Sequence, residues 1–176
     1  GWQSAFLASS TTIMTGGSQI VGTASSVLIN GGYQNVMRKA YDTMITDGYQ
    51  VLSGRIYTAS RGGDEEFYGD DADNLYNELS IPTASNTTIS GGFQFVLDAA
   101  SSFITDIYDD GVQEISGSIN FQDTGYYTSH PKGLYNAAVF STTIHSGGKQ
   151  RIADGGQATS TTINTGGIQH ISSGGQ

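Results

Sequence analysis

The tripeptide Gly-x-Gln recurs eight times in this chain of 176 residues, and each copy opens a short block. The copies begin at Gly1, Gly17, Gly32, Gly48, Gly92, Gly111, Gly148 and Gly167. Val, Ile, Leu or Ala stands two residues after the Gln in nearly every copy, and a Thr-Thr-Ile phrase closes several blocks. Self-similarity of this kind is the signature of stacked-repeat proteins. The chain is therefore predicted to be a solenoid.

The blocks are too short for helical repeats. From the second copy onward, successive block starts lie 15, 16, 44, 19, 37 and 19 residues apart, whereas two packed helices need roughly 33 residues. Short blocks rich in Gly, Thr, Val and Ile suit strands joined by tight turns, and Gly-Gly pairs permit positive φ at each corner. The predicted fold class is all-β: a right-handed parallel β-helix (β-solenoid) of about eight rungs, with residues 1–176 as a single domain.

Alternation along the strands separates inward from outward side chains. In the segment Lys149 to Ile152 the two cations must face water, so Gln150 and Ile152 face inward. The same rule places Ile115 and Ile171 inward. The Gln side chains lie on the inner side or at its corner, where we expect them to stack in a ladder that satisfies their amide groups.

Two stretches interrupt the repeats, at about residues 53–82 and about residues 116–140. The first carries seven of the chain's 16 acidic residues together with several tyrosines, and the second is rich in tyrosine. Insertions in repeat proteins map to loops on one face, which is often the binding face. We expect two inserted loops there.

The charge balance excludes several classes of partner. The net charge is −9, which argues against a nucleic-acid partner because phosphates require a positive surface. The absence of Cys excludes disulfides and thiolate chemistry. No apolar run is long enough to span a bilayer as a helix.

Four aromatic residues occupy the position just before the Gln of their block: Trp2, Tyr33, Tyr49 and Phe93. An outward row of aromatics could stack on sugars or pack against another rod, as a ligand or self-association surface. The favoured interpretation is that the insertions fold back and cover this row. Exposure of the row is the alternative.

Carboxylate clusters are the candidates for catalysis or metal binding. Asp70, Asp71 and Asp73 form one group and Asp109 and Asp110 another, and paired carboxylates suit glycoside cleavage. The simpler interpretation is a solvated acidic surface. Hard oxygen ligands in the first group also suit Ca²⁺, but the EF-hand spacing is absent.

The three histidines, His130, His145 and His170, lack zinc-ligand spacing and are interpreted as surface residues at repeat positions. We therefore expect no catalytic residues, no cofactor and no bound metal.

The C-terminal blocks resemble a known repeat family. Residues 146–175 read SGGKQRIADGGQATSTTINTGGIQHISSGG, which resembles the AIDA-type repeats of self-associating autotransporter adhesins of Gram-negative bacteria. The resemblance is strong over 141–176, degenerate over 1–50 and 83–115, and absent from the insertions. It implies the N-terminal fragment of a passenger domain that is exported through its own outer-membrane barrel. Such a passenger is a right-handed parallel β-helix, displayed on the bacterial surface or released outside the cell.

The resemblance also implies partners and a modification. Members of the family mediate host-cell adherence, autoaggregation and biofilm formation, so the implied partners are a second copy aligned lengthwise and host-cell surfaces or glycans. Several members carry O-linked heptose on repeat serines, added by cytoplasmic heptosyltransferases. By position, the acceptor candidates here are Ser90, Ser146, Ser172 and Ser173. Asn30, Thr15, Thr165 and Asp154 hold comparable positions in other turns, so only some blocks are expected to carry sugar.

The hypothesis from sequence is a non-enzymatic, surface-displayed adhesin passenger. Two alternatives stay open at this point. One is a carbohydrate-active β-helix enzyme, either a polysaccharide lyase or a hydrolase, and the other is an inert structural spacer.

Overall fold

The computed structural model describes residues 1–60, 75–121 and 133–176, and every regular element in these ranges is a β-strand. The strands are β1 (Trp2–Ser9), β2 (Thr12–Met14), β3 (Ser18–Ser53), β4 (Arg55–Ser60), β5 (Leu75–Ser80), β6 (Thr83–Ser90), β7 (Phe93–Leu97), β8 (Ser101–Tyr108), β9 (Val112–Ser116), β10 (Ser118–Phe121), β11 (Gly133–Asn136), β12 (Ala138–Ile144), β13 (Lys149–Ile152), β14 (Gln157–Thr159), β15 (Thr162–Ile163) and β16 (Ile168–Ile171). A 12-stranded sheet contains all of them except β4, β5, β10 and β11.

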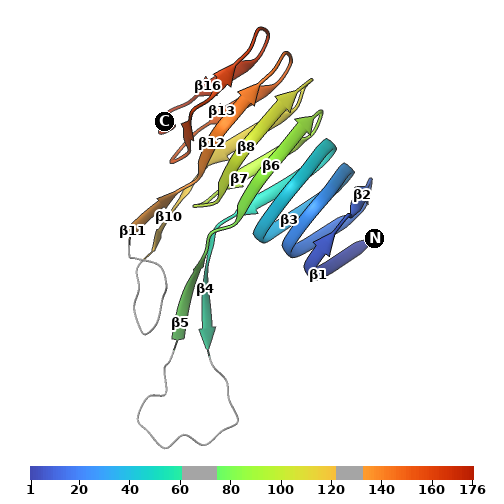
Figure 1. Cartoon of the computed structure of the whole chain (residues 1–176). Coiled ribbons are helices and arrows are strands. Elements are labelled where there is room, and N and C mark those ends of the chain that lie inside the picture. The colour runs from blue at the N-terminus through green and yellow to red at the C-terminus, as the bar shows by residue number, and fades with distance from the viewer. Residues whose placement is uncertain (61–74, 122–132) are drawn as a thin grey trace, which may run out of the picture.

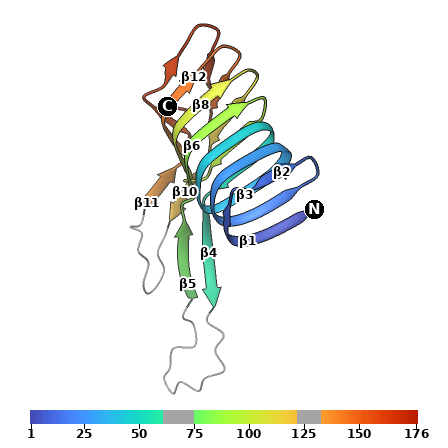
Figure 2. The same cartoon turned by 45° about the vertical axis from the view of Figure 1, so that its right-hand side comes forward.

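The 12-stranded sheet coils into a β-helix because each turn of the chain pairs in parallel with the turn before it. The long β3 winds through successive turns and pairs with β1 and β2 on one side and with β6 and β7 on the other. Figures 1 and 2 show the rungs stacked from the N-terminal to the C-terminal end of the chain. The pairing confirms the predicted parallel β-helix.

Each rung contributes to two walls. The first wall contains the Gln-bearing strands β7, β9, β13 and β16, which pair in that order. The second wall contains β6, β8 and β12, followed by β14 and β15. β3 contributes to both walls. We call the turn from the second wall to the first the first corner, and the turn from the first wall to the second the second corner.

A column of isoleucines forms the core on the second wall. Ile89, Ile107 and Ile144 are in direct register and fully buried. Burial of such a side chain contributes about 1.5–3 kcal/mol, so the repeated Ile is a main source of stability for each rung. On the first wall, Ile115 and Ile152 are buried as predicted.

Ile171 lies opposite Ile152 in register, as predicted for an inward residue, but 53% of its surface is exposed. It belongs to the last rung, so no further rung covers it.

The Gln residues form the predicted ladder without interruption. From Gln19 to Gln169, each side-chain Nε2 donates to the Oε1 of the Gln one rung earlier, over 2.7–2.9 Å, so the ladder begins at Gln3 as an acceptor. The central members are fully buried. A threonine column on the second wall joins them, because Gln50 also donates to Thr43 Oγ1 and Gln94 to Thr87 Oγ1, both at 3.3 Å. A buried amide group without its hydrogen-bond partner lowers the stability of the fold by about 1–3 kcal/mol. A shift of one rung against the next would break these bonds, so the ladder strongly favours one register.

A bend crosses the middle of the second wall at the same position in every rung. The residue there has positive φ although none is Gly. The members of this column are Ser10, Ser26, Asp42, Asn86, Ile104, Ser141 and Ser160, with φ between 50° and 59°. Ser, Asn and Asp visit this left-handed region more readily than other residues because their short polar side chains bond locally. Ile104 is the exception, since a β-branched residue is strained at positive φ.

Glycines at the first corner allow successive rungs to touch. Gly48 has φ +91°, and a Cβ placed there would collide with the carbonyl oxygen of Gly32 in the preceding rung. Gly16 has a similar φ of +76°, but a Cβ there would meet open space. Positive φ therefore favours glycine at both positions, and close packing of the rungs adds to this preference at Gly48, which opens a Gly-x-Gln copy, whereas Gly16 directly precedes one.

Two antiparallel hairpins leave the β-helix at the second corner. β4 pairs with β5, and β10 pairs with β11. The first hairpin follows Leu52 of the first wall and returns to the second wall at Thr83, and the second follows Ile115 and returns at Ala138. Both extend from the same edge of the rod (Figures 1 and 2). The domain limits of 1–176, with insertions at about 53–82 and 116–140, stay a prediction.

Candidate functional site

The aromatic row on the first wall is partly assembled into a cluster. Tyr49 stacks on Phe93 of the next rung, with ring centroids 5.4 Å apart. Phe95, two residues further along β7, lies 6.2 Å from Tyr49 and 6.1 Å from Phe93. The planes differ by 8–17°. We call Tyr49, Phe93 and Phe95 the aromatic platform, because three nearly equal distances describe a triangle and not a single column.

The other two predicted members of the row stand apart from the platform. Tyr33 occupies the preceding rung, since Gln50 bonds to Gln34, and it is exposed. Trp2 lies at the first rung, where Ser18 follows it in register and separates it from Tyr33. Thus the structure brings Tyr49 and Phe93 into contact, adds Phe95, and leaves Trp2 isolated.

The described parts of the insertions do not cover this row, contrary to the favoured interpretation from sequence. Tyr49 is 46% exposed and Trp2 is 68% exposed. The hairpin strands extend away from the rod instead of lying along the first wall (Figures 1 and 2). The physical reason is that both hairpins leave at a corner in a direction that carries them past the edge of the sheet.

Polar side chains follow the platform along the first wall. Glu114 is in register with Phe95, and Arg151 is in register with Glu114. Neither side chain has an ion-pair or hydrogen-bond partner among the described residues. Lys149 instead pairs with Asp110 at 3.2 Å, in an exposed position. The wall therefore passes from aromatic to charged within one or two rungs.

The candidate serines lie at two different corners. Ser90 ends β6 and Ser146 follows β12, so both lie at the first corner, whereas Ser172 and Ser173 follow β16 and lie at the second corner. Ser146, Ser172 and Ser173 are exposed, and Ser90 is half-buried. Serines that hold similar positions beside Gly-Gly pairs in the sequence therefore lie at two separate edges of the rod. Their role as acceptors stays a prediction.

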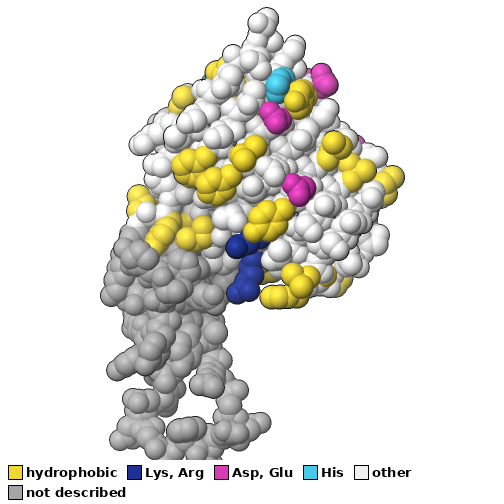
Figure 3. Space-filling view, in the orientation of Figure 1, with side chains coloured by type: hydrophobic (Ala, Val, Ile, Leu, Met, Phe, Trp, Pro, Cys, Tyr) yellow, Lys and Arg dark blue, Asp and Glu magenta, His cyan; other side chains and the backbone are white. Residues whose placement is uncertain are grey.

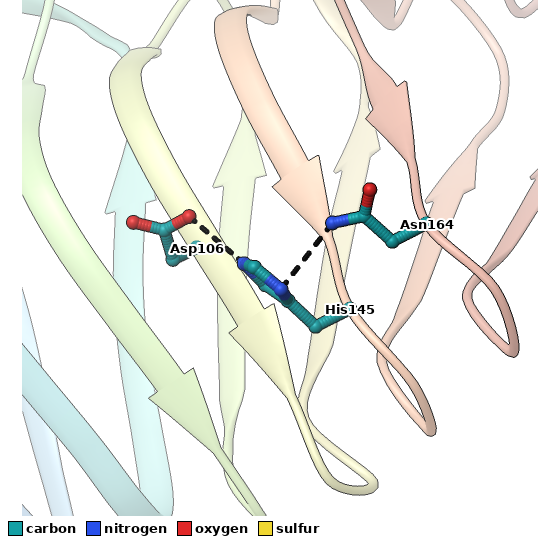
Figure 4. Close-up of polar contacts among 3 residues, drawn as sticks. All are labelled: Asp106, His145 and Asn164. Atoms are coloured by element: carbon teal, nitrogen blue, oxygen red, sulfur yellow. Dashed lines mark hydrogen bonds and ion pairs between the residues drawn. The ribbon is translucent and has the colours of Figure 1, made fainter.

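The end of the second wall carries a polar cluster that the sequence does not predict. His145 Nε2 lies 3.2 Å from Asp106 Oδ1, and its Nδ1 lies 3.4 Å from the side-chain nitrogen of Asn164 (Figure 4). In the tautomer that carries its proton on Nε2, the imidazole donates to Asp106 and accepts from the side-chain amide of Asn164. Tyr108 stacks on the imidazole at 4.0 Å. These contacts join His145 to residues of the rungs on both sides of it, and among the described residues no hydroxyl side chain is hydrogen-bonded to the imidazole.

A second aromatic group lies at the middle of the second wall (Figure 3). Phe103 stacks on Phe140 of the next rung at 5.0 Å. The strained Ile104 beside them is 53% exposed. Tyr41 occupies the same column, two rungs earlier, and is exposed. The rest of this wall presents mainly Ser, Thr and Asn.

Of the predicted carboxylate groups, only Asp109 and Asp110 lie within the described residues. Asp70, Asp71 and Asp73 lie outside the described residues, as does His130. Asp109 and Asp110 form an exposed first corner with positive φ. In the described ranges no group of three or more His, Asp or Glu residues is positioned to hold a metal ion. No helix in the described structure is long and apolar enough to cross a membrane.

No family model matches the sequence, and no curated protein matches it. Among solved structures, the chain is similar to the crystal structure of a TibC-catalysed, hyper-glycosylated fragment of TibA. The sequences are 26% identical, the TM-score is 0.40, and the alignment covers 96% of this chain and 73% of that fragment.

Proposed function

We propose that this chain is part of the passenger domain of a surface-displayed bacterial adhesin, without enzymatic activity. The observation that carries the proposal is the way the AIDA-like blocks fold. Residues 146–175 form successive rungs in which Gln150 and Gln169 extend the buried ladder. The repeats that resemble an adhesin family thus build a rod in which every rung keeps the same register. The same outward positions therefore recur along each wall, and such a wall can repeat one kind of contact many times.

The second wall suits lengthwise association of two copies. Its outward positions in the described strands carry few charges, namely Lys39, Asp42 and Asp106. Two molecules with a net charge of −9 repel each other, so an almost uncharged wall is the favourable surface for contact. Repeated hydroxyl groups, such as those of Thr143 and Thr162 in adjacent rungs, form weak bonds whose number gives avidity.

Association is tested by display of residues 1–176 as a passenger on a non-aggregating Gram-negative strain. We expect the cells to settle from suspension, and we expect added soluble chain to inhibit settling. Thr143→Glu combined with Thr88→Glu adds negative charges on both sides of Asp106, which lies in register between them, and should abolish settling. Lys149→Gln, on the first wall, is the matched control and should not. Normal settling of the double variant would contradict the proposed contact surface.

Heptose modification is the second part of the proposal. Ser146 is the favoured acceptor because it is exposed in a corner that is flanked by Gly147. Ser90 is half-buried and should react less. Intact mass after coexpression with a heptosyltransferase tests this, with Ser146→Ala as the control. Additions of whole heptose units that decrease in the variant support the proposal, and an unchanged mass would remove glycosylation from it while leaving adhesion to the settling experiment.

The absence of catalysis is tested by incubation of the chain with pectic, alginate and cellulosic polysaccharides. We expect no release of reducing or unsaturated sugars. Release that disappears on substitution of Asp109 or Asp110 would favour the enzymatic alternative.

A further inference from the structure

We infer that a hollow at the second corner of the first three rungs binds a carboxylate-bearing sugar at the end of a glycan chain. The inference rests on the proposed adhesin function and gives it a ligand class. The hollow has a volume of about 380 Å³. Ligand pockets in proteins usually measure about 300–1,000 Å³, so this one suits a single sugar residue and part of its neighbour.

A glycine makes room for the hollow. Phe6, Gly22 and Met37 each stand three residues after the Gln of their rung, and all three line the hollow. Gly22 has no side chain, and a Cβ placed there would lie 2.7 Å from the carbonyl oxygen of Phe6. The floor is therefore backbone, with Phe6 on one side and Met37 on the other. Because rungs are about 4.8 Å apart, these two sides are roughly 10 Å apart, which matches one substituted pyranose.

An extra residue in the third rung brings a cation to the rim of the hollow. In the second rung, the inward Ala24 stands five residues after Gln19. In the third rung, the inward Ala40 stands six residues after Gln34. The corner of the third rung is therefore longer by one residue, and it carries the exposed Arg38.

The guanidinium of Arg38 is placed to bind a carboxylate. It reaches back across the second rung, and its central carbon lies over the Phe6 ring, 5.8 Å from the ring centre, within the range of a cation–π contact. A guanidinium over an aromatic ring keeps N–H donors at its edge, where they match the two oxygens of a carboxylate. Arg38 has no ion pair or hydrogen bond within the described part of the chain, so these donors are available.

The other groups of the hollow suit the rest of a sugar. Ser4 and Ser80 line it with hydroxyl groups. Ser80 Oγ donates to the carbonyl oxygen of Met37 at 2.8 Å, which joins the end of β5 to the rim and leaves the Ser80 oxygen free to accept from a sugar hydroxyl. Phe6 is 67% exposed, so part of its ring surface is open to the C–H groups of the sugar. These groups are in place without a ligand, which lowers the ordering cost of binding.

The local charge favours an acidic ligand although the whole chain has a net charge of −9. Charges farther than about 8 Å are largely screened at physiological ionic strength, so Arg38 and the neighbouring Lys39 dominate here. Figure 3 shows Lys and Arg side chains beside hydrophobic ones at this edge of the rod. A hydrogen bond between two charged groups is roughly twice as strong as a neutral one, so a carboxylate is preferred to a hydroxyl.

The shape of the hollow favours the end of a glycan over a peptide strand. Phe6 and Met37 bound it along the rod, so a chain that continued in both directions would meet one of these side chains. A terminal sugar enters without this conflict. It also offers hydroxyls to Ser4 and Ser80 and a C–H face to Phe6 at the same time.

The test is saturation-transfer NMR of residues 1–176 with 3′-sialyllactose and a disaccharide of glucuronic acid as acidic probes and with lactose as the neutral probe. We expect transfer to at least one acidic probe. Lactose lacks the carboxylate and should bind at least about fivefold more weakly. Circular dichroism and urea unfolding establish that each variant below is folded.

Three substitutions locate the site. Arg38→Gln removes the guanidinium and should weaken binding of the acidic probe about tenfold or more. Arg38→Lys keeps the charge but loses the paired N–H donors, so it should weaken binding about threefold to fivefold. Arg151→Gln removes another exposed cation, on the first wall. It is the matched control and should bind normally.

Four results would overturn the inference: no transfer to either acidic probe, equal binding of lactose, an equal loss in the Arg151→Gln control, or equally tight binding of acetate or of a peptide with a free C-terminus. If no acidic probe binds but displayed cells still settle, the hollow is not a sugar site and the proposed adhesin function stands. If an acidic probe binds but cells do not settle, the site is correct and the self-association part of the proposal fails.

Discussion

The side-chain Nε2 of Gln150 donates a hydrogen bond of 2.8 Å to the Oε1 of Gln113, although 37 residues separate them in sequence. Gln113 donates in turn to Gln94 at 2.8 Å. All three are fully buried. Each interior Gln is therefore both donor and acceptor in one continuous chain of amides, and the loss of a single member affects the rungs on both sides.

We expect Gln94→Leu to lower the free energy of unfolding by roughly 2–4 kcal/mol. The substitution leaves Gln50 Oε1 without its donor and removes the acceptor of Gln113 Nε2, both in the core. Urea unfolding followed by circular dichroism measures the change. Gln3→Leu is the control, because Gln3 is exposed and takes part in one ladder bond, so its loss should cost about 1 kcal/mol or less. Equal effects of the two substitutions would contradict the importance of burial.

Gly48→Ala should destabilise the rod more than Gly16→Ala does. Both positions have positive φ, so Ala meets backbone strain of about 1 kcal/mol at each. Only at Gly48 does the new Cβ also collide with Gly32, which should raise the total cost to roughly 2–4 kcal/mol. The midpoints of chemical unfolding for the two variants test the comparison. A larger loss for Gly16→Ala would mean that strain at the corner, and not contact between rungs, decides the preference for Gly.

Ile104→Asn should stabilise the protein by about 1 kcal/mol. The backbone φ of 55° is strained for Ile and tolerated by Asn, and the exposed side chain sacrifices little buried surface. The reverse change at an equivalent position, Ser141→Ile, should cost a similar amount. Thermal unfolding of both variants provides the measurement. A loss of stability in Ile104→Asn would show that the partly buried surface of the Ile side chain contributes more than the strain costs.

Asp110→Asn should leave stability unchanged within about 0.5 kcal/mol. The carboxylate of Asp110 pairs with Lys149, but the two side chains are 88% and 40% exposed, so water screens the interaction. Asn also tolerates the positive φ at this corner. Unfolding in low and high salt checks the expectation. A larger contribution from the ion pair would appear as a stability difference between the unsubstituted chain and the variant that high salt removes.

The ladder and the core could be predicted from the sequence because alternation is strict in the best-preserved blocks. Lys149 and Arg151 on either side of Gln150 leave only one inward assignment. The bend in the second wall could not be read as easily, because Ser, Asp, Asn and Ile share that column. A signal is nonetheless present, since six of its seven residues are Ser, Asp or Asn, which tolerate positive φ.

The clusters on the walls depend on which rungs are neighbours, and the insertions hide this in the sequence. Asp106 and His145 lie in adjacent rungs, although they are 39 residues apart in sequence. The separation is large because the second hairpin lies between them in the sequence. Phe95 escapes the sequence analysis for a different reason. It stands after the Gln of its block, a position that alternation places on the same outward face as the residue before the Gln, but only the structure shows that its ring stacks with Tyr49 of the neighbouring rung.

The hairpins at the second corner have a consequence for how such a rod can be altered. Gln94 bonds to Gln50 across 44 residues as closely as Gln34 bonds to Gln19 across 15, at 2.9 Å and 2.8 Å. The ladder bonds therefore depend on which turns of the β-helix are neighbours and not on the number of residues between those turns. Foreign loops or whole small domains grafted at this corner would be carried by the rod while the stacked rungs stay intact.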